Sequence, residues 1–234
     1  MHIPRTFYRW CWLPLYRRFV LWYVQKERFW RYGDLTLQVP PGVFHPGLYL
    51  STPIMLDFLS RQSLGGLKVL DMGTGSGALA LRAAQMGADV CAADIHPDAT
   101  ATARANADRA KLPLTVVQSD LFSAIPAQCF DVILANPPYY PKNAENMAEY
   151  AFFAGEGLDY FQRFFGEATR FCHSGTQIWM VLSEDCRIQV IHECAHKAGF
   201  GSKTVAEQYH WGERLFIEVF CPDQLFSNQI NCPD

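Results

Sequence analysis

No run of 18 apolar residues occurs in the sequence, and the longest candidate, Phe19–Val24, is far too short to cross a bilayer. A membrane-spanning helix needs about 20 consecutive apolar residues. The charged and apolar pattern of a secretory signal peptide is also missing. We therefore expect no transmembrane segment and a cytoplasmic location.

Eight cysteines are present, but no two of them form a Cys-x-x-Cys pair, the spacing typical of zinc sites and redox motifs. Several lie within apolar strand or helix patterns, which indicates free buried thiols in a reducing compartment. Internal repeats and low-complexity tracts are also missing. Half of the 234 residues are hydrophobic, so the chain can bury about 70% of its unfolded surface and needs no disulfide or metal for stability.

The most informative segment is the tetrapeptide Asn136-Pro137-Pro138-Tyr139, which follows the apolar run Phe130–Ala135. The asparagine offers a side-chain oxygen and a backbone carbonyl as acceptors, the prolines stiffen the loop, and the tyrosine offers a ring for stacking. Such a loop suits a planar NH2 group, whose nitrogen is a poor nucleophile because resonance ties up its lone pair. The alternative is a proline-rich turn after a buried strand.

A glycine loop lies upstream, where an apolar strand is followed by Gly73, Gly75 and Gly77 and then by a helical pattern. These glycines permit positive φ and a close approach of the backbone to a ligand, and the helix would point its free N–H groups at that ligand. The spacing of Gly73, Gly75 and Ala78 also satisfies the dinucleotide fingerprint. A nicotinamide-dependent oxidoreductase is therefore an alternative.

Two carboxylates favour S-adenosylmethionine as the cofactor. Asp71 stands two residues before the first glycine, where it could meet the cofactor's ammonium group rather than repel a pyrophosphate. Asp94 ends the next strand, about 20 residues further on, the usual place for a carboxylate that holds ribose hydroxyls. Hydride transfer has no use for the Asn-Pro-Pro-Tyr loop, so the combination predicts a methyltransferase.

Strands and helices alternate from Lys68 onward. Strands are expected at residues 68–72, 89–94, 114–119, 130–135, 176–182, 203–209 and 214–221, and helices at 76–87, 97–111, 158–173 and 186–198. This order predicts an α/β fold with a doubly wound, mostly parallel seven-stranded sheet, Rossmann-like, that ends in an antiparallel hairpin. Four polar residues then fall at strand carboxyl ends, where such sheets bind ligands: Asp71, Asp94, Asp120 and Asn136.

Residues from about 68 to 166 resemble the catalytic domain of the protein-(glutamine-N5) methyltransferases that modify peptide-chain release factors, a family with the class I methyltransferase fold. The stretches that carry the resemblance are Val69–Ala80, Ala93–Asn106, Gln118–Ser123, Asn136–Tyr139 and Gly155–Tyr160. They cover about two-fifths of the chain, and each motif is shared with many class I methyltransferases.

The resemblance implies a role for each matching position on the cofactor side. Asp71, Gly73 and Gly75 would contact the methionine end of S-adenosylmethionine. Asp94 and Ile95 would hold the ribose and the edge of the adenine.

On the remaining sides of the site, the resemblance implies that Asp120 and Leu121 bound the adenine and that residues 136–139 hold the acceptor amide. Members of the family carry a helical substrate-binding domain ahead of the catalytic one, followed by an acidic Pro-x-Glu-Thr-Glu segment, whereas about 40 residues precede the catalytic part in this sequence. Val43–Thr52 stands in the place of that segment and is expected to form the approach to the cofactor.

The first 32 residues are basic and aromatic. They hold seven Arg and Lys against one acid, Glu27, and eleven aromatic residues, which include four of the six Trp. Cations interleaved with rings suit phosphates and stacked bases, so residues 5–32 could contact nucleic acid. They equally suit an anionic membrane surface. An amphipathic helix docked on the catalytic domain is the third possibility.

His192-Glu-Cys-Ala-His196 matches the H-E-x-x-H pattern of zinc proteases. The apolar stripe of this helix is formed by neighbouring Ile and Ala residues, which leaves both histidines on a polar flank typical of a surface crossover helix. We therefore expect no metal site. His45 and His210 could line the acceptor entrance, although a lone histidine is more often structural.

Taken together, these patterns predict an S-adenosylmethionine-dependent N-methyltransferase acting on a planar nitrogen by a single in-line displacement. The favoured acceptor is a protein glutamine side chain, and an adenine or other base in RNA or DNA is the alternative. We expect an N-terminal extension at 1–40, a methyltransferase domain at 41–222 and a tail at 223–234. The expected catalytic residues are Asn136, Pro137, Pro138 and Tyr139.

Overall fold

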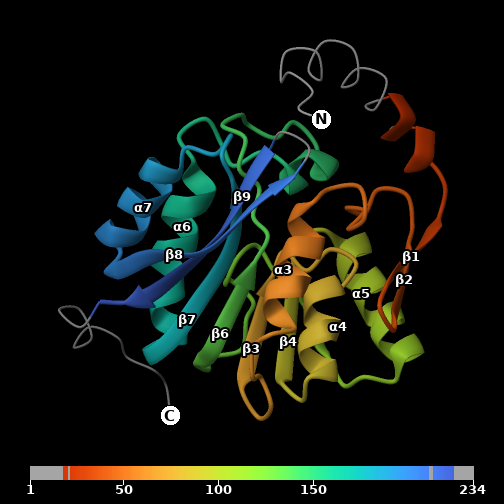
Figure 1. The fold of residues 1–234 in the computed structure, drawn as a ribbon, viewed down its shortest axis with the longest axis horizontal. Helices are drawn as coiled ribbons and strands as arrows, with labels where there is room; N and C mark the ends of the chain where they lie inside the picture. Colours follow the sequence, from red (N-terminus) through yellow and green to blue (C-terminus); the bar gives the residue numbers. More distant parts are fainter. Residues whose placement is uncertain (1–17, 21, 211–212, 224–234) are drawn as a thin grey trace.

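The computed structural model describes residues 18–20, 22–210 and 213–223. A seven-stranded sheet in the order β5-β4-β3-β6-β7-β9-β8 forms its centre (Figure 1). Its strands are β3 (Lys68–Met72), β4 (Asp89–Asp94), β5 (Thr115–Gln118), β6 (Phe130–Ala135), β7 (Cys172–Ser183), β8 (Phe200–His210) and β9 (Glu213–Pro222).

The first five strands of this sheet are parallel, and β9 pairs antiparallel with both β7 and β8. The central strand β3 is buried at four of its five positions, as expected for a parallel strand covered on both faces. The expected class of fold, a doubly wound and mostly parallel sheet with a terminal antiparallel hairpin, is confirmed.

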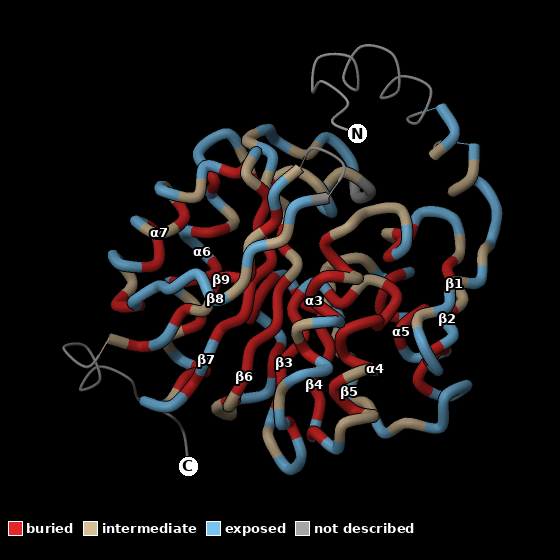
Figure 2. The backbone as a smooth tube through the Cα atoms, viewed as in Figure 1, coloured by how far each residue is buried: buried red, intermediate tan, exposed pale blue. Residues whose placement is uncertain are grey.

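Helices cover both faces of the sheet. The helices are α3 (Ser51–Leu59), α4 (Ala78–Gln85), α5 (Pro97–Ala110), α6 (Asp159–Ala168) and α7 (Ile188–Lys197), with short 3-10 helices η2 (Met147–Ala151) and η3 (Thr169–Phe171). The apolar clusters place α3 and α4 on one face and α6 and α7 on the other. The buried residues accordingly gather in the strands and on the inner sides of the helices (Figure 2).

Helix α6 shows why these segments are helical. Its buried residues, Phe161, Phe164, Phe165 and Ala168, recur at the spacing of one helix face, so burial of that face stabilises the helix. The sequence pattern predicted that this helix ends at residue 173. This prediction is wrong, because the backbone becomes extended at Cys172, where β7 begins. Phe171 is buried at a helical spacing from Phe164, and this explains the overrun.

An antiparallel hairpin that the sequence analysis did not foresee precedes the sheet. It is formed by β1 (Arg28–Tyr32) and β2 (Leu35–Val39). The alternate residues Leu35, Leu37 and Val39 are buried against α4 and α5. Asn106 of α5 exchanges two 2.9 Å hydrogen bonds with the Gln38 backbone and donates a third to the Ser76 carbonyl, so it ties the hairpin to the glycine loop.

Four of the described cysteines are buried free thiols, as expected: Cys91, Cys172, Cys186 and Cys194. Cys129 is disulfide-bonded.

Within residues 18–20, 22–210 and 213–223, no helix is both long and apolar enough to span a bilayer.

Candidate active site

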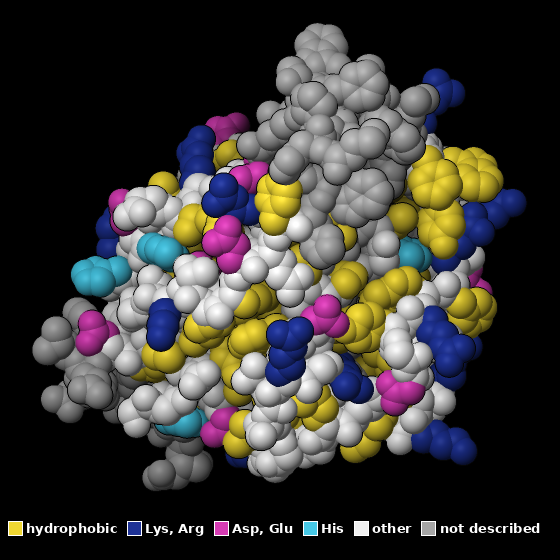
Figure 3. Space-filling view, in the orientation of Figure 1, with side chains coloured by type: hydrophobic (Ala, Val, Ile, Leu, Met, Phe, Trp, Pro, Cys, Tyr) yellow, Lys and Arg dark blue, Asp and Glu magenta, His cyan; other side chains and the backbone are white. Residues whose placement is uncertain are grey.

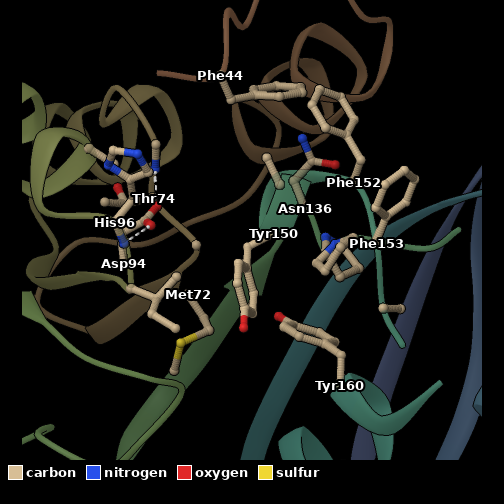
Figure 4. Close-up of a pocket in the computed structure, with 18 of the residues that line it drawn as sticks. Phe44, Met72, Thr74, Asp94, His96, Asn136, Tyr150, Phe152, Phe153 and Tyr160 are labelled. Carbon is tan, nitrogen blue, oxygen red and sulfur yellow. Dashed lines mark hydrogen bonds between the residues drawn. The ribbon is translucent and has the colours of Figure 1, made fainter. Parts of the chain in front are cut away.

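A cavity of about 430 Å³ opens beyond the carboxyl ends of β3, β4 and β6. It brings together nearly all of the site residues expected from the sequence. Those that line it are Asp71, Gly73, Gly75, Asp94, Ile95, Asp120, Leu121, Asn136, Pro137, Pro138 and Tyr139. Residues from widely separated parts of the chain face one another across it (Figure 4).

Gly77 is the expected site residue that the structure does not bring to the cavity wall. It has a φ of 88° and stands at the start of α4, which explains why this helix begins at Ala78 rather than at residue 76. A Cβ on Gly77 would lie 3.3 Å from the backbone of Ala103, so the missing side chain allows α4 and α5 to pack closely.

Asp71 is almost completely buried and holds the start of α4. Its Oδ2 accepts hydrogen bonds from Thr74 Oγ1 at 2.7 Å and from the Ala80 amide at 3.0 Å. Burial is the largest influence on this carboxyl and raises its pKa to about 6, with a smaller contribution from the nearby Asp94 charge. Because both bonds use Oδ2, the second carboxylate oxygen can accept from a ligand.

Asp94 fixes the turn between β4 and α5. Its two carboxylate oxygens accept from the amides of Gly75, at 2.8 Å, and His96, at 2.9 Å. Burial raises the pKa of this carboxyl, and the backbone hydrogen bonds oppose that rise. His96 in turn caps α5, since its Nδ1 accepts from the Asp98 amide at 3.1 Å. The carboxylate is therefore preorganised at the cavity wall (Figure 4).

The third acidic position, Asp120, is paired with a cation that the sequence analysis did not single out. Arg163 of α6 lies 3.0 Å from its carboxylate and also contacts Glu167 at 3.4 Å. The next residue, Leu121, is buried with a φ of 49°, a left-handed conformation that costs about 1 kcal/mol or more outside glycine. Ser119 holds this turn by donating its hydroxyl to the Leu121 carbonyl at 2.7 Å.

Asn136 is oriented by a residue that is distant in the sequence. Its Nδ2 donates to Thr52 Oγ1 of α3 at 3.3 Å, so the amide nitrogen faces Thr52 and the side-chain oxygen remains available as an acceptor. Thr52 itself is buried. The structure thus identifies Thr52 as a positioning residue, and the sequence offered no motif that could have revealed it.

The backbone after the two prolines is held in place by a second loop. The amides of Tyr139 and Tyr140 both donate to the Phe152 carbonyl, at 3.2 Å and 3.0 Å. The rings of the two tyrosines lie 4.9 Å apart, and burial raises the pKa of the Tyr139 phenol, which therefore stays neutral at physiological pH. The Asn-Pro-Pro-Tyr loop is accordingly rigid on both sides of the prolines.

Aromatic rings close the side of the cavity next to Asn136. Phe44 and Tyr49 are stacked with ring centres 4.9 Å apart, and the Phe152 ring lies 5.9 Å and 5.6 Å from them. Figure 4 shows the Phe44 and Phe152 rings beside the Asn136 side chain. Segment 43–52 therefore lines the cavity, as the sequence predicted, although the partnership with Phe152 could not be read from it.

A pair of tyrosines also lines the cavity. The hydroxyls of Tyr150 and Tyr160 point toward one another, next to Met72 (Figure 4). Burial raises the pKa of Tyr160, and the charges of Asp94 and Asp71 raise it further. Tyr160 is therefore a neutral hydrogen-bonding group close to the acidic wall.

Two of the histidines singled out by the sequence have structural contacts. His192 Nε2 lies 3.1 Å from the buried Glu218 of β9, and no group of three potential metal ligands occurs among the described residues. His45 is buried against Tyr23, outside the cavity wall, and burial lowers its pKa. The side chain of His210 lies outside the described residues.

The largest part of the chain matches a known protein family. Residues 34–209 match the family model described as "Methyltransferase small domain". This match begins inside the β1–β2 hairpin and ends within β8, so it includes the whole cavity described above.

Two curated relatives illustrate the sequence similarity. A release factor glutamine methyltransferase of Gloeobacter violaceus is 39% identical over 127 residues, which cover 52% of this chain and 43% of that protein. A ribosomal protein L11 methyltransferase of Thermus thermophilus is 36% identical over 108 residues, covering 46% and 42%. The chain therefore spans less than half the length of these curated relatives.

Two solved structures show the same fold at low identity. The T. thermophilus 16S rRNA N2 G1207 methyltransferase, in complex with AdoMet and guanosine, has a TM-score of 0.62 at 20% identity, covering 85% of this chain and 50% of that chain. The E. cuniculi Mtq2–Trm112 complex has a TM-score of 0.62 at 21% identity, and the match covers 78% of this chain and 99% of that chain.

Proposed function

Because the chain belongs to the methyltransferase small domain family, we propose that it methylates a planar amide or amino nitrogen, with a protein glutamine side chain as the favoured acceptor. The family match and the curated relatives support S-adenosylmethionine-dependent methyl transfer as the class of activity. The acceptor and the role of each site residue are the finer parts of the proposal.

The acidic wall of the cavity fits the charges of this cofactor. Asp71, Asp94 and Asp120 all line it, and the cofactor carries a sulfonium and an ammonium group. We assign Asp71 to the ammonium group, as the resemblance implied, since its second carboxylate oxygen can accept. Asp94 would hold the ribose hydroxyls, and Asp120 with Leu121 would bound the adenine. When bound, the cofactor supplies the methyl group.

The observation that carries the proposed acceptor is the orientation of Asn136. Its amide nitrogen is occupied by Thr52, so its oxygen can accept from a substrate NH2 group. An acceptor at this point holds the nitrogen in place and stabilises the positive charge that develops on it during transfer. The rigid proline loop keeps this oxygen in position, and such positioning supplies much of the catalysis in a reaction without a covalent enzyme intermediate.

The described cavity wall offers no side chain that must act as a general base. The methylated nitrogen becomes acidic once its resonance is broken, so its proton can pass to solvent. Tyr139 and Tyr160 remain protonated because burial raises the pKa of each. In this proposal they bind and orient, and they do not remove a proton.

An exocyclic amino group of a nucleobase is the second candidate acceptor. The stacked pair of Phe44 and Tyr49, with Phe152 beside it, supports this candidate because aromatic rings favour flat, extended ligands. A glutamine amide is smaller than a base and uses less of this aromatic surface. The same Asn136 oxygen would serve either acceptor.

The two acceptors can be separated by the product. The protein is incubated with cofactor carrying a labelled methyl group and with fractionated cell extract, and the product is digested with protease or with nuclease. Label released as methylglutamine after protease treatment supports the favoured acceptor. Label released only by nuclease establishes the second candidate in its place. The Asn136→Ala variant is the control, and labelling that persists in this variant contradicts both assignments.

A further inference from the structure

Three aromatic side chains near the start of the described chain are exposed to solvent. The exposed fractions of Phe19, Trp22 and Phe29 are 47%, 58% and 59%. None of them lines the catalytic cavity. Burying a ring of this size is usually favourable, so exposed rings grouped together indicate a surface that is covered by a partner.

Cations accompany two of these rings. The Arg109 guanidinium of α5 lies over the Phe29 ring, 5.5 Å from its centre, and the Arg28 guanidinium lies 5.7 Å from the centre of the Trp22 ring. Arg31 follows two residues after Phe29 on β1, so both point from the same side of the strand, and both are exposed. Hydrophobic and basic side chains lie next to one another along the edge of the molecule occupied by β1 and β2 (Figure 3).

Polar residues complete this surface. Gln38 and Thr36 of β2 lie directly across from Phe29 and Arg31, and Arg109 also donates to the Gln38 side chain. We refer to the exposed side chains of Phe29, Arg31 and Arg109, together with the half-buried Gln38, as the β1 face. The exposed Trp22 borders this face, next to Arg28 on the other side of the strand. The β1 face therefore combines a ring, two guanidinium groups and an amide, with a second ring at its border.

We propose that the β1 face binds single-stranded nucleic acid. Its rings can stack on unpaired bases, and its guanidinium groups can contact the phosphates between them. Stacking without base-specific hydrogen bonds predicts binding with little sequence preference. Such a surface would keep the methyltransferase close to a nucleic-acid-bound substrate, whichever of the two acceptors the cavity takes.

The composition of the β1 face argues against a membrane surface. Rings that enter the headgroup zone of a bilayer form a continuous apolar patch with cations around it. Here Arg109 lies directly over the Phe29 ring, and Thr36 and Gln38 occupy the neighbouring strand. Inserting Phe29 into the bilayer would carry a guanidinium and an amide with it, which costs free energy. A nucleic acid can bind both groups, because its phosphates contact the guanidinium and its bases contact the amide.

Fluorescence anisotropy of a labelled single-stranded RNA of about 12 nucleotides tests this inference, at about 50 mM and about 200 mM salt. The same measurement with the DNA strand, with the corresponding duplex, and with vesicles of phosphatidylcholine and phosphatidylserine compares the possible partners. No turnover is measured, so the outcome is independent of the proposed function. Circular dichroism shows that each variant retains its fold.

Matched variants separate rings from cations. Trp22→Ala and Phe29→Ala should each weaken single-strand binding by about tenfold, the loss expected for one stacked base. Arg31→Gln and Arg109→Gln should each lower the salt-dependence slope by about 0.7. The controls lie on β8, where Tyr209 is equally exposed: Tyr209→Ala and Lys203→Gln should leave binding unchanged.

Four outcomes would overturn the inference. They are the absence of measurable nucleic-acid binding in low salt, binding to vesicles alone, duplex binding as tight as single-strand binding, and ring variants that bind like the parent protein. Binding of RNA and DNA single strands alike supports it, since the recognition uses bases and phosphates that both share. An activity assay that fails while single-strand binding persists would count against the proposed acceptor and not against the β1 face.

Discussion

The cavity has two halves that are built in different ways. The half that we propose for the cofactor, the cofactor half, is formed by strand ends and a glycine loop, and its carboxylates are held by backbone amides of Gly75, Ala80 and His96. The half that we propose for the acceptor, the acceptor half, is formed by side chains from two loops and a helix, with Thr52 bonded to Asn136 and aromatic rings around it. The first half therefore depends on local sequence, and the second depends on tertiary contacts.

This difference predicts that variants of the two halves separate binding from chemistry. Changes in the cofactor half should alter cofactor affinity, whereas changes in the acceptor half should alter turnover at nearly constant cofactor affinity.

The largest effect is expected for Asn136→Ala. Removing the acceptor oxygen should lower turnover by at least about 100-fold, by analogy with loss of one oxyanion-hole partner. Cofactor affinity should stay within a few-fold, since Asn136 belongs to the acceptor half. Methyl-transfer kinetics and calorimetry with S-adenosylhomocysteine measure the two quantities, and unchanged turnover would remove the catalytic role from this loop.

Asp94→Ala should weaken cofactor binding by about 1–3 kcal/mol, because the ribose hydroxyls lose a charged acceptor. Asp94 ends β4, and the exposed Asp89 begins the same strand. Asp89→Ala is therefore a matched control at the far end, and it should leave calorimetric affinity unchanged. Equal affinities for the two variants, or tight NADH binding by the parent protein, would contradict the assignment.

Cofactor affinity should fall in acid because of Asp71. Burial raises the pKa of this carboxyl to about 6 in the free protein, and the bound ammonium group favours its charged form. Affinity should be constant above the pKa and fall by up to about tenfold for each pH unit below it. Titrations with S-adenosylhomocysteine measure this dependence, and Asp71→Asn should abolish it. A parent protein with pH-independent affinity would show that Asp71 does not meet the ammonium group.

Rising pH should strengthen cofactor binding through Asp71, but it should weaken the contribution of the same carboxyl to the stability of the free protein. Its pKa is raised from 3.8, so the folded state binds more protons than the unfolded state between about pH 4 and pH 6. Its contribution to the free energy of unfolding is present at low pH and is lost as pH rises through 6. Binding of the cofactor should reverse this loss, which thermal denaturation with and without S-adenosylhomocysteine can detect.

The smallest effect is expected for Thr52→Val, which keeps the shape of the side chain and removes the oxygen that accepts from Asn136. A freed amide can rotate, so turnover should fall by about fivefold, the value of one ordinary hydrogen bond. Thr52→Ser retains the oxygen and should keep most of the activity. If both variants behave alike, packing at α3 and not the hydrogen bond orients Asn136.

The sequence predicted the sheet, its antiparallel end, and the three carboxylates and two of the three glycines of the cofactor half. These features depend on alternating apolar strands and on glycine spacing, which are visible within a few residues. The sequence placed Thr52 in a segment near the cofactor but not its contact with Asn136, and it did not single out Arg163 or Phe152. Each of these contacts joins residues well separated in the chain: 84 residues for Thr52, 43 for Arg163 and 12 or 13 for Phe152.

The hairpin at residues 28–39 was missed for a different reason. Its β1 strand carries Arg28, Trp30 and Tyr32 on one side and Phe29 and Arg31 on the other, so neither side is apolar throughout. The pattern resembled a basic and aromatic extension, and only the packing of β2 on α4 and α5 gives it a fixed structure.

One contact links this hairpin to the aromatic wall of the cavity. A Cβ on Gly47 would lie 2.3 Å from the Trp30 indole nitrogen, so the indole occupies the space that a side chain would need. The two positions should therefore covary: members of the family with a larger residue at the position of Gly47 should carry a smaller one at the position of Trp30. The segment 43–52 and the hairpin should therefore evolve together. Transplanting only one of them into a relative should fail to reproduce the cavity wall.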